Sequence, residues 1–156
     1  MTNDEKRALV LQWAESQLGV IEYPFGSNKV KYNDWFYGKV GATGAWCMAE
    51  VQWVFNRAGL PLPVKTPSCT VLAAYAKKNK QWVTTGYKPG DILFMHWGKD
   101  ASVTEHVGIV KEVSGKYVVA YEGNTSLANQ ANGGSVMERN RAYVNITGAY
   151  RPWYNM

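Results

Sequence analysis

The sequence lacks any long hydrophobic run. Its apolar stretches, such as residues 92–95 and 117–121, are far shorter than the roughly 20 residues that a membrane-spanning helix needs. The N-terminal segment MTNDEKRALV has mixed charge and lacks the basic region followed by an apolar stretch that marks a secretory signal. We therefore expect neither a membrane span nor a signal peptide.

Cysteine and histidine are scarce, with two of each in 156 residues. Cys47 and Cys69 lie in different sequence contexts with no cysteine framework around them, so we expect no disulfide. The sequence also has no internal repeat, no low-complexity tract and only 19% charged residues, while 46% are hydrophobic. That profile predicts one ordered domain spanning residues 1–156.

The net charge of +5 favours an acidic partner. Its lysines and arginines are scattered, however, and only Lys77, Lys78 and Lys80 form a small cluster. We therefore do not expect a nucleic-acid binder.

Helical patterns come first along the chain and strand patterns follow. Thr2 and Glu5 have the spacing of a capping box, which predicts a helix over residues 4–18 that ends at Gly19. A second helix is predicted in AWCMAEVQWVFNRAGLP, and a third begins after Pro67 with Ser68 as its cap. Residues 20–45 indicate a long irregular segment. Strands are predicted in ILFMHW, HVGIVKEV, KYVVAYEG, SVMERN and ITGAYRP, so the expected fold class is α+β.

Cys47 falls in the first turn of the second predicted helix. Free N–H groups and the helix dipole there stabilise a thiolate and can also hold the oxyanion of a tetrahedral intermediate. Position alone leaves a structural cysteine as the commoner alternative. A cysteine nucleophile needs a histidine base, and the choice is His106, which begins a strand, or His96, beside Trp97. We select His106 and keep His96 as a candidate for the substrate pocket.

The hairpin that follows His106 has two candidate registers. A two-residue turn at residues 114–115 would pair His106 with Gly123 and point Glu122 to the opposite face. A three-residue loop at residues 114–116 would instead pair Val113 with Tyr117 and His106 with Asn124. We predict the three-residue loop.

That register places His106, Glu122 and Asn124 on one face of the hairpin. Glu122 or Asn124 could then accept a hydrogen bond from the second imidazole nitrogen. Gly108 and Ala120 share this face, and their small size predicts that the Cys47 helix packs there. Taken alone, Glu122-Gly123-Asn124 would indicate only a turn at a strand end.

Five ordered motifs together resemble the CHAP family of cysteine amidohydrolases and peptidases, within the papain-like and NlpC-like group of folds. They are Trp46-Cys47, Gly90-Asp91, residues 106–110 (HVGIV), residues 122–124 (EGN) and residues 148–152 (GAYRP), the last with an inserted Ala149. The resemblance implies N-terminal helices packed on a C-terminal antiparallel sheet or half-barrel of about five or six strands. It also implies hydrolysis of a peptidoglycan amide, with Cys47, His106 and Glu122 catalytic, Asn124 assisting, and no cofactor.

Further expectations follow from the resemblance. The bond cut lies either between muramic acid and L-alanine or within the stem or cross-bridge peptide, and the sequence does not choose. Relatives include phage endolysins and bacterial autolysins, which implies a bacteriolytic monomer acting on Gram-positive walls. It would be phage-encoded and released to the wall, or exported by another route, and anionic wall polymers would attract its positive charge. Some relatives bind calcium before the nucleophile, but between Lys31 and Trp46 only Asp34 offers a carboxylate, so no metal is expected.

Residues 30–37 (VKYNDWFY) are candidates for lining a substrate groove, because aromatic walls suit sugars and peptides. Core packing is an equal alternative for Trp35 and Phe36. The candidate substrate residues are Tyr32, Asn33, Trp35, Trp46 and His96. Two other functions use the same features: an inactive module that binds the cell wall, and an amidase or acyl-transfer enzyme acting on a non-wall amide.

Overall fold

The computed structural model describes residues 1–152. Its four helices are α1 (Asn3–Glu15), α2 (Lys31–Tyr37), α3 (Cys47–Arg57) and α4 (Cys69–Lys78). Its strands are β1 (Trp82–Val83), β2 (Ile92–Met95), β3 (His106–Ser114), β4 (Tyr117–Thr125), β5 (Ser135–Ala142) and β6 (Ile146–Tyr150), with a 3-10 turn, η1, at Tyr143–Asn145. The predicted α+β class is confirmed. None of the helices in the described part of the chain is both long and apolar enough to cross a membrane.

The helices begin where the sequence supplies caps. The Thr2 hydroxyl accepts from the Glu5 N–H and the Glu5 carboxylate accepts from the Thr2 N–H, which is the predicted capping box. The Ser68 hydroxyl caps α4 in the predicted position. The prediction of an entirely irregular segment over residues 20–45 is wrong, because Lys31–Tyr37 forms α2 and Gly38 ends it in a left-handed conformation.

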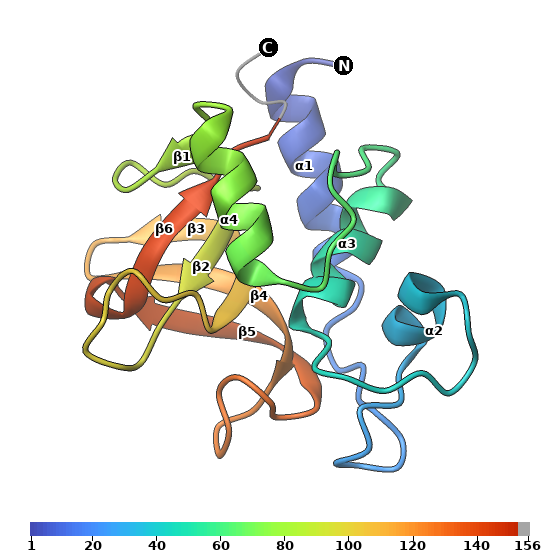
Figure 1. Ribbon diagram of the computed structural model, residues 1–156. Helices are drawn as coiled ribbons and strands as arrows, with labels where there is room; N and C mark the ends of the chain where they lie inside the picture. The colour runs from blue at the N-terminus through green and yellow to red at the C-terminus, as the bar shows by residue number, and fades with distance from the viewer. Residues whose placement is uncertain (153–156) are drawn as a thin grey trace.

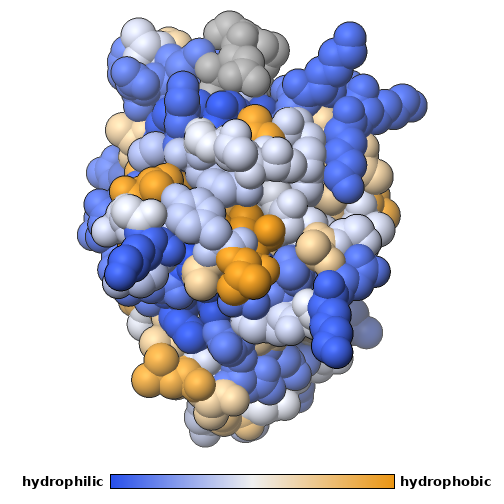
Figure 2. All heavy atoms as spheres, turned by 90° about the vertical axis from the view of Figure 1, so that its left-hand side faces the viewer, coloured by the Kyte–Doolittle hydropathy of each residue, from blue (hydrophilic) through white to orange (hydrophobic). Residues whose placement is uncertain are grey.

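All strands pair in one antiparallel sheet of order β1-β6-β2-β3-β4-β5. The two-residue β1 was not predicted, because two residues carry no alternating pattern. In Figure 1 the helices α1, α2 and α3 lie to one side of the sheet and α4 lies in front of it. Figure 2 shows the sheet side of the molecule, where hydrophobic residues form small patches among hydrophilic ones. Most apolar side chains of the sheet are therefore interior.

The sheet has a core on each face. Val107, Ile109 and Tyr121 belong to the larger cluster, which they share with the apolar residues of α3. The smaller cluster includes Val110 and Ala120 and lies on the opposite face. The prediction that α3 packs on the Gly108 and Ala120 face is therefore wrong.

Two different glycines permit these close contacts. A Cβ on Gly123 would lie 2.8 Å from the Glu50 Cβ of α3, so this glycine admits the helix. A Cβ on Gly108 would lie 2.7 Å from the Cγ of Glu122, so that glycine admits a side chain of the hairpin itself. At either position, a residue larger than glycine would force the neighbouring atoms to move.

The β3–β4 hairpin reaches the predicted register by an unpredicted route. Ser114 pairs with Tyr117 across a two-residue turn, so the predicted pairing of Val113 with Tyr117 is wrong. A bulge between Val110 and Glu112 then shifts the register, and Ile109 pairs with Tyr121 as the predicted arrangement requires. The bulge compensates for the shorter turn.

Candidate active site

Cys47 is the first residue of α3, and its position is fixed by the tryptophan before it. Trp46 is fully buried, stacks on Tyr32 with ring centroids 5.5 Å apart, and donates through Nε1 to the Glu22 carboxylate at 3.1 Å. The Trp46 carbonyl accepts the first helical hydrogen bond, from the Glu50 N–H at 3.0 Å. Cys47 is only 6% exposed, so this helix start is nearly closed to solvent.

His106 and Glu122 form a buried hydrogen-bonded pair. His106 Nε2 lies 2.9 Å from Glu122 Oε1, and both side chains are fully buried. The other imidazole nitrogen, Nδ1, has no hydrogen-bond partner among the described residues, and the Cys47 thiol is the other acidic group that acts on this imidazole. The imidazole therefore connects the thiol to the carboxylate.

Arg141 of β5 holds Glu122 from the side opposite His106. Its Nε donates to Glu122 Oε2 at 2.7 Å, and its Nη2 donates to Oε1. Its Nη1 donates to Gln130 Oε1. This bidentate contact satisfies the carboxylate and fixes its plane. The sequence analysis missed Arg141, because its side chain reaches Glu122 across the β4–β5 pairing.

The charges of this cluster favour a thiolate–imidazolium pair. The interaction with the Cys69 thiol is the largest cause that lowers the pKa of Cys47; burial opposes it, His106 adds to it, and the pKa falls well below its usual value. Burial lowers the pKa of His106, but Cys47 and Glu122 outweigh it and raise that pKa to about 9. Burial raises the pKa of Glu122, but Arg141 and His106 outweigh it and lower that pKa overall.

Cys69 is the unexpected neighbour of Cys47. Both cysteines are free, and each is the first residue of its helix. Cys69 packs against the core cluster that contains Cys47, and its thiol interacts with that of Cys47. The sequence placed Cys69 in the third helix but gave no sign that this helix starts beside the nucleophile.

Asn124 does not contact the imidazole through any hydrogen bond of the described residues. Its Oδ1 accepts from the Gly134 N–H at 3.0 Å, and its Nδ2 donates to Asn132 Oδ1 at 3.0 Å. The residue adopts a left-handed backbone with φ 55°. Of the two candidates for holding His106, Glu122 makes the contact and Asn124 organises the loop before β5.

The Trp97 ring lies beside the His106 ring, whereas the ring contact of His96 is with the Gly98 carbonyl. The rings of Trp97 and His106 are 5.9 Å apart, and the Arg141 guanidinium lies 5.1 Å from the Trp97 ring on which it stacks. His96 is buried, its Nδ1 lies 3.2 Å from the Gly98 carbonyl, and its backbone bonds to Asn145. Trp97 is thus a site residue that the sequence analysis mentioned only as a neighbour.

Four of the five candidate substrate residues are interior, His96 among them. Tyr32, Asn33 and Trp46 are fully buried, so the expectation that they contact substrate directly is corrected. Asn33 donates to the carbonyls of Asn28 and Gly44, and Tyr32 donates to Gln17, so their polar groups brace the loops around α2. Trp35 remains partly exposed, with Lys65 Nζ 4.8 Å from its ring.

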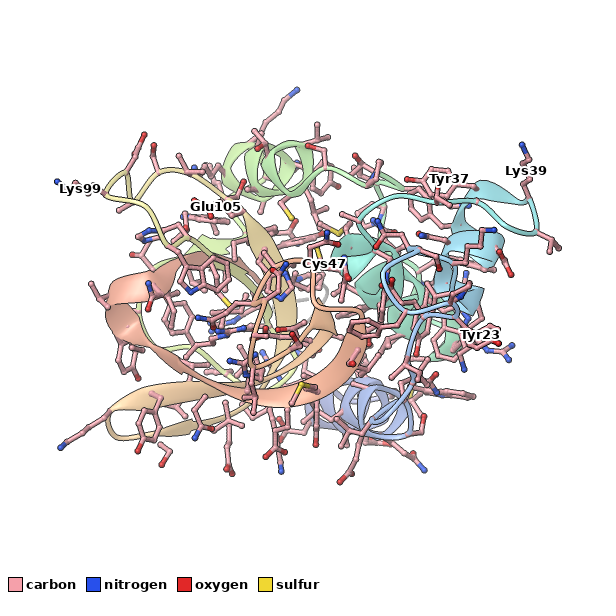
Figure 3. The ribbon with its side chains drawn as sticks, turned by 90° about the horizontal axis from the view of Figure 1, so that it is seen from below. Tyr23, Tyr37, Lys39, Cys47, Lys99 and Glu105 are labelled. Carbon is pink, nitrogen blue, oxygen red and sulfur yellow. The ribbon has the colours of Figure 1, made fainter. Side chains whose placement is uncertain are left out.

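In Figure 3, Cys47 lies between two projecting loops. One carries Lys99 and Glu105, and the other carries Lys39 and follows Tyr37, the last residue of α2. A separate hollow of about 450 Å³ is lined by residues on either side of α2's start, including Tyr23, Lys31 and Val40, but not by Cys47. We place the chemistry at Cys47, because the residues that line the hollow include neither a cysteine nor a histidine. Within residues 1–152, no three His, Cys, Asp or Glu side chains gather closely enough to hold a metal ion.

The comparison with protein families agrees with this geometry. The CHAP domain model matches residues 37–124, which include Cys47, His106, Glu122 and Asn124. The fold and the site define a cysteine- and histidine-dependent amidohydrolase of α+β architecture. The chain belongs to the CHAP domain family. The comparison with curated proteins gave no match.

Proposed function

We propose that this protein hydrolyses an amide bond of bacterial peptidoglycan through an acyl-enzyme on Cys47. The observation that carries the proposal is a chain of buried, interacting side chains. It runs from Cys47 at the start of α3 through His106 and Glu122 to Arg141. The family supports peptidoglycan as the substrate class. The net charge of +5 suits a wall that carries anionic polymers.

In the proposed reaction the Cys47 thiolate attacks the amide carbonyl, and a carbon–sulfur bond forms. Free N–H groups at the start of α3 stabilise the oxyanion. The His106 imidazolium gives its proton to the leaving nitrogen as the carbon–nitrogen bond breaks. Water then attacks the thioester while His106 accepts a proton, which releases the acid and restores the thiolate. Glu122 keeps the imidazole oriented throughout.

The test is lysis of purified Gram-positive peptidoglycan, followed by turbidity and by mass spectrometry of the released fragments. Wild type should release fragments, whose masses name the bond as muramoyl-L-alanine or as a stem or cross-bridge peptide bond. Cys47→Ala and His106→Gln should release none, whereas His96→Gln, at the other histidine, should retain activity. Wall binding without release would instead support an inactive binding module. Release equal in wild type and Cys47→Ala would overturn the thiol mechanism.

Gram-positive specificity, a monomeric state and delivery from a phage or by a separate export route belong to the same proposal. Comparing walls of several chemotypes tests the specificity, and light scattering of the purified protein tests the oligomeric state. Loss of lysis at high salt would support attraction by anionic wall polymers.

A further inference from the structure

Glu50 is a buried carboxyl group that the proposed mechanism does not use. It lies on α3 one turn after Cys47, and its side chain is fully buried. Neither carboxylate oxygen has a hydrogen-bond partner among the described residues. The carboxyl group therefore contributes nothing to a polar network.

The backbone around Glu50 is built to accommodate it. Its Cβ and Cγ pack directly against Gly123, where an added Cβ would lie only 2.8 and 3.0 Å away. Gly123 separates Glu122 from Asn124 on β4. Glu50 therefore occupies the space between the helix that carries the nucleophile and the strand that carries the partner of His106.

An apolar side chain of similar size would fill this space more favourably. Burying a carboxyl group without a donor costs free energy, and burying it in its charged form costs more. Locally unfavourable groups of this kind concentrate at functional sites. A role in the chemistry of the site accounts for a group that packing does not require.

The titratable groups facing Glu50 come from four elements. The pKa of Glu50 is raised to about 8: burial is the main cause, the Cys47 thiolate adds to it, His106 of β3 opposes it, and Glu122 of β4 makes the smallest contribution, which also raises the pKa. Tyr32 of α2 also senses Glu50, although burial is the main cause of its raised pKa.

We propose that Glu50, whose buried and unpaired carboxyl group packs against Gly123 beside Glu122, is a positioning residue that acts through His106 and favours the protonated imidazole when it ionises. This inference rests on the proposed function and extends it. The interaction between the two groups is reciprocal: since His106 favours the charged form of Glu50, the Glu50 carboxylate favours imidazolium. At neutral pH the uncharged carboxyl does not compete with the Cys47 thiolate. Glu50 thus extends the pH range of hydrolysis to higher pH without reducing the activity near neutral pH.

The test compares wild type with Glu50→Gln, which has nearly the same shape and cannot ionise. The chain has only two histidines, so the imidazole NMR signals of His106 and His96 can be followed separately across pH. We expect the His106 midpoint to fall by about half a pH unit or more in Glu50→Gln, with His96 unchanged as the internal reference. The alkylation rate of Cys47 by iodoacetamide near pH 6 should stay within about twofold.

An unchanged His106 midpoint in folded Glu50→Gln would overturn the proposal and leave Glu50 as a packing residue. Glu50→Met gives the same comparison should the glutamine variant fail to fold. Neither the His106 midpoint nor the Cys47 alkylation rate needs a substrate. The proposed role of Glu50 and the proposed hydrolysis of peptidoglycan can therefore fail independently. A shifted midpoint without wall hydrolysis would overturn the proposed function alone, and hydrolysis without a shift would overturn this inference alone. With both in place, the alkaline limb of hydrolysis should move to lower pH in Glu50→Gln.

Discussion

The reactivity of Cys47 is predicted to depend on a second thiol, that of Cys69, as well as on His106. Because a hydrogen bond from Cys69 is the largest cause of the lowered pKa of Cys47, Cys69→Ala should raise that pKa by about one unit or more. The measurement is the pH dependence of Cys47 alkylation by iodoacetamide. Cys69→Ser keeps a donor and should fall between alanine and wild type. Equal midpoints in all three proteins would show that His106 and the helix start suffice.

Arg141 is predicted to keep Glu122 charged and oriented. Arg141→Met would leave a fully buried carboxylate with His106 as its remaining charged partner, so the free energy of unfolding should fall by about 3–5 kcal/mol. Loss of imidazole orientation should reduce hydrolysis about tenfold or more. Urea unfolding and initial rates of wall lysis measure the two effects.

Arg139→Met is the matched control for Arg141, because Arg139 lies on the same strand and bonds to Thr125 and Ser126 instead of Glu122. Its loss should affect the loop before β5 more than the rate. Similar rate losses in both variants would contradict a specific role for Arg141.

The residues of this site differ in how readable they are from sequence. Cys47, His106 and Glu122 could be predicted, because a helix start, a strand start and a short hairpin fix them locally. Cys69 and Glu50 could not, because their roles depend on how α4 and α3 pack. No local pattern distinguishes such a cysteine or glutamate from an ordinary core or surface residue.

At the scale of elements, the β3–β4 hairpin has the predicted register although the predicted length of its loop is wrong. The predicted three-residue loop implied the register that the structure has at Ile109 and Tyr121. The turn length and the bulge changed together, and neither has a distinct sequence signature here. The face that receives α3 was misjudged for a similar reason: Gly108 and Gly123 look alike in sequence, but they make room for different groups.

The contact between α3 and β4 is expected to be intolerant of even one methyl group. Gly123→Ala would place a Cβ 2.8 Å from Glu50 Cβ and 3.1 Å from the Trp46 ring, so the helix start must move. Overpacking of this kind costs about 1–3 kcal/mol. A displacement of Cys47 by about 1 Å should also reduce hydrolysis by roughly 100-fold.

Gly98→Ala is the matched control, because its Cβ would meet only the Glu105 carboxylate at an ordinary 3.7 Å. Thermal unfolding and lysis rates of the two variants should therefore separate. A Gly123→Ala protein with wild-type rate and stability would show that α3 can shift without disturbing the site.

At the scale of the whole molecule, Asp91 joins segments that are far apart in sequence. Its fully buried carboxylate accepts from Arg151 Nε at 2.9 Å and Nη2 at 2.8 Å, and Arg7 Nη1 lies 3.5 Å away. It also accepts from the Lys88 N–H at 2.8 Å. The Gly90-Asp91 motif and the closing arginine therefore form one structural contact that ties α1, the start of β2 and the end of β6 together. The sequence showed both motifs but not that they bind each other.

Removing this carboxylate should destabilise the fold without touching the nucleophile. Asp91→Ala leaves two partly buried guanidinium groups without their common anion, and loss of one partner of a buried ion pair costs about 3–5 kcal/mol. For a chain of this size that lowers the melting temperature by roughly 10 °C. Glu138→Gln removes the exposed Lys111 pair and should cost at most about 1 kcal/mol. Asp91 stabilises the contact between α1, β2 and β6, away from Cys47. At temperatures below the melting temperature of the variant, Asp91→Ala should therefore show the same pH midpoint of Cys47 alkylation as wild type. A shifted midpoint would instead mean that the Asp91 contact and the active site around Cys47 are energetically coupled.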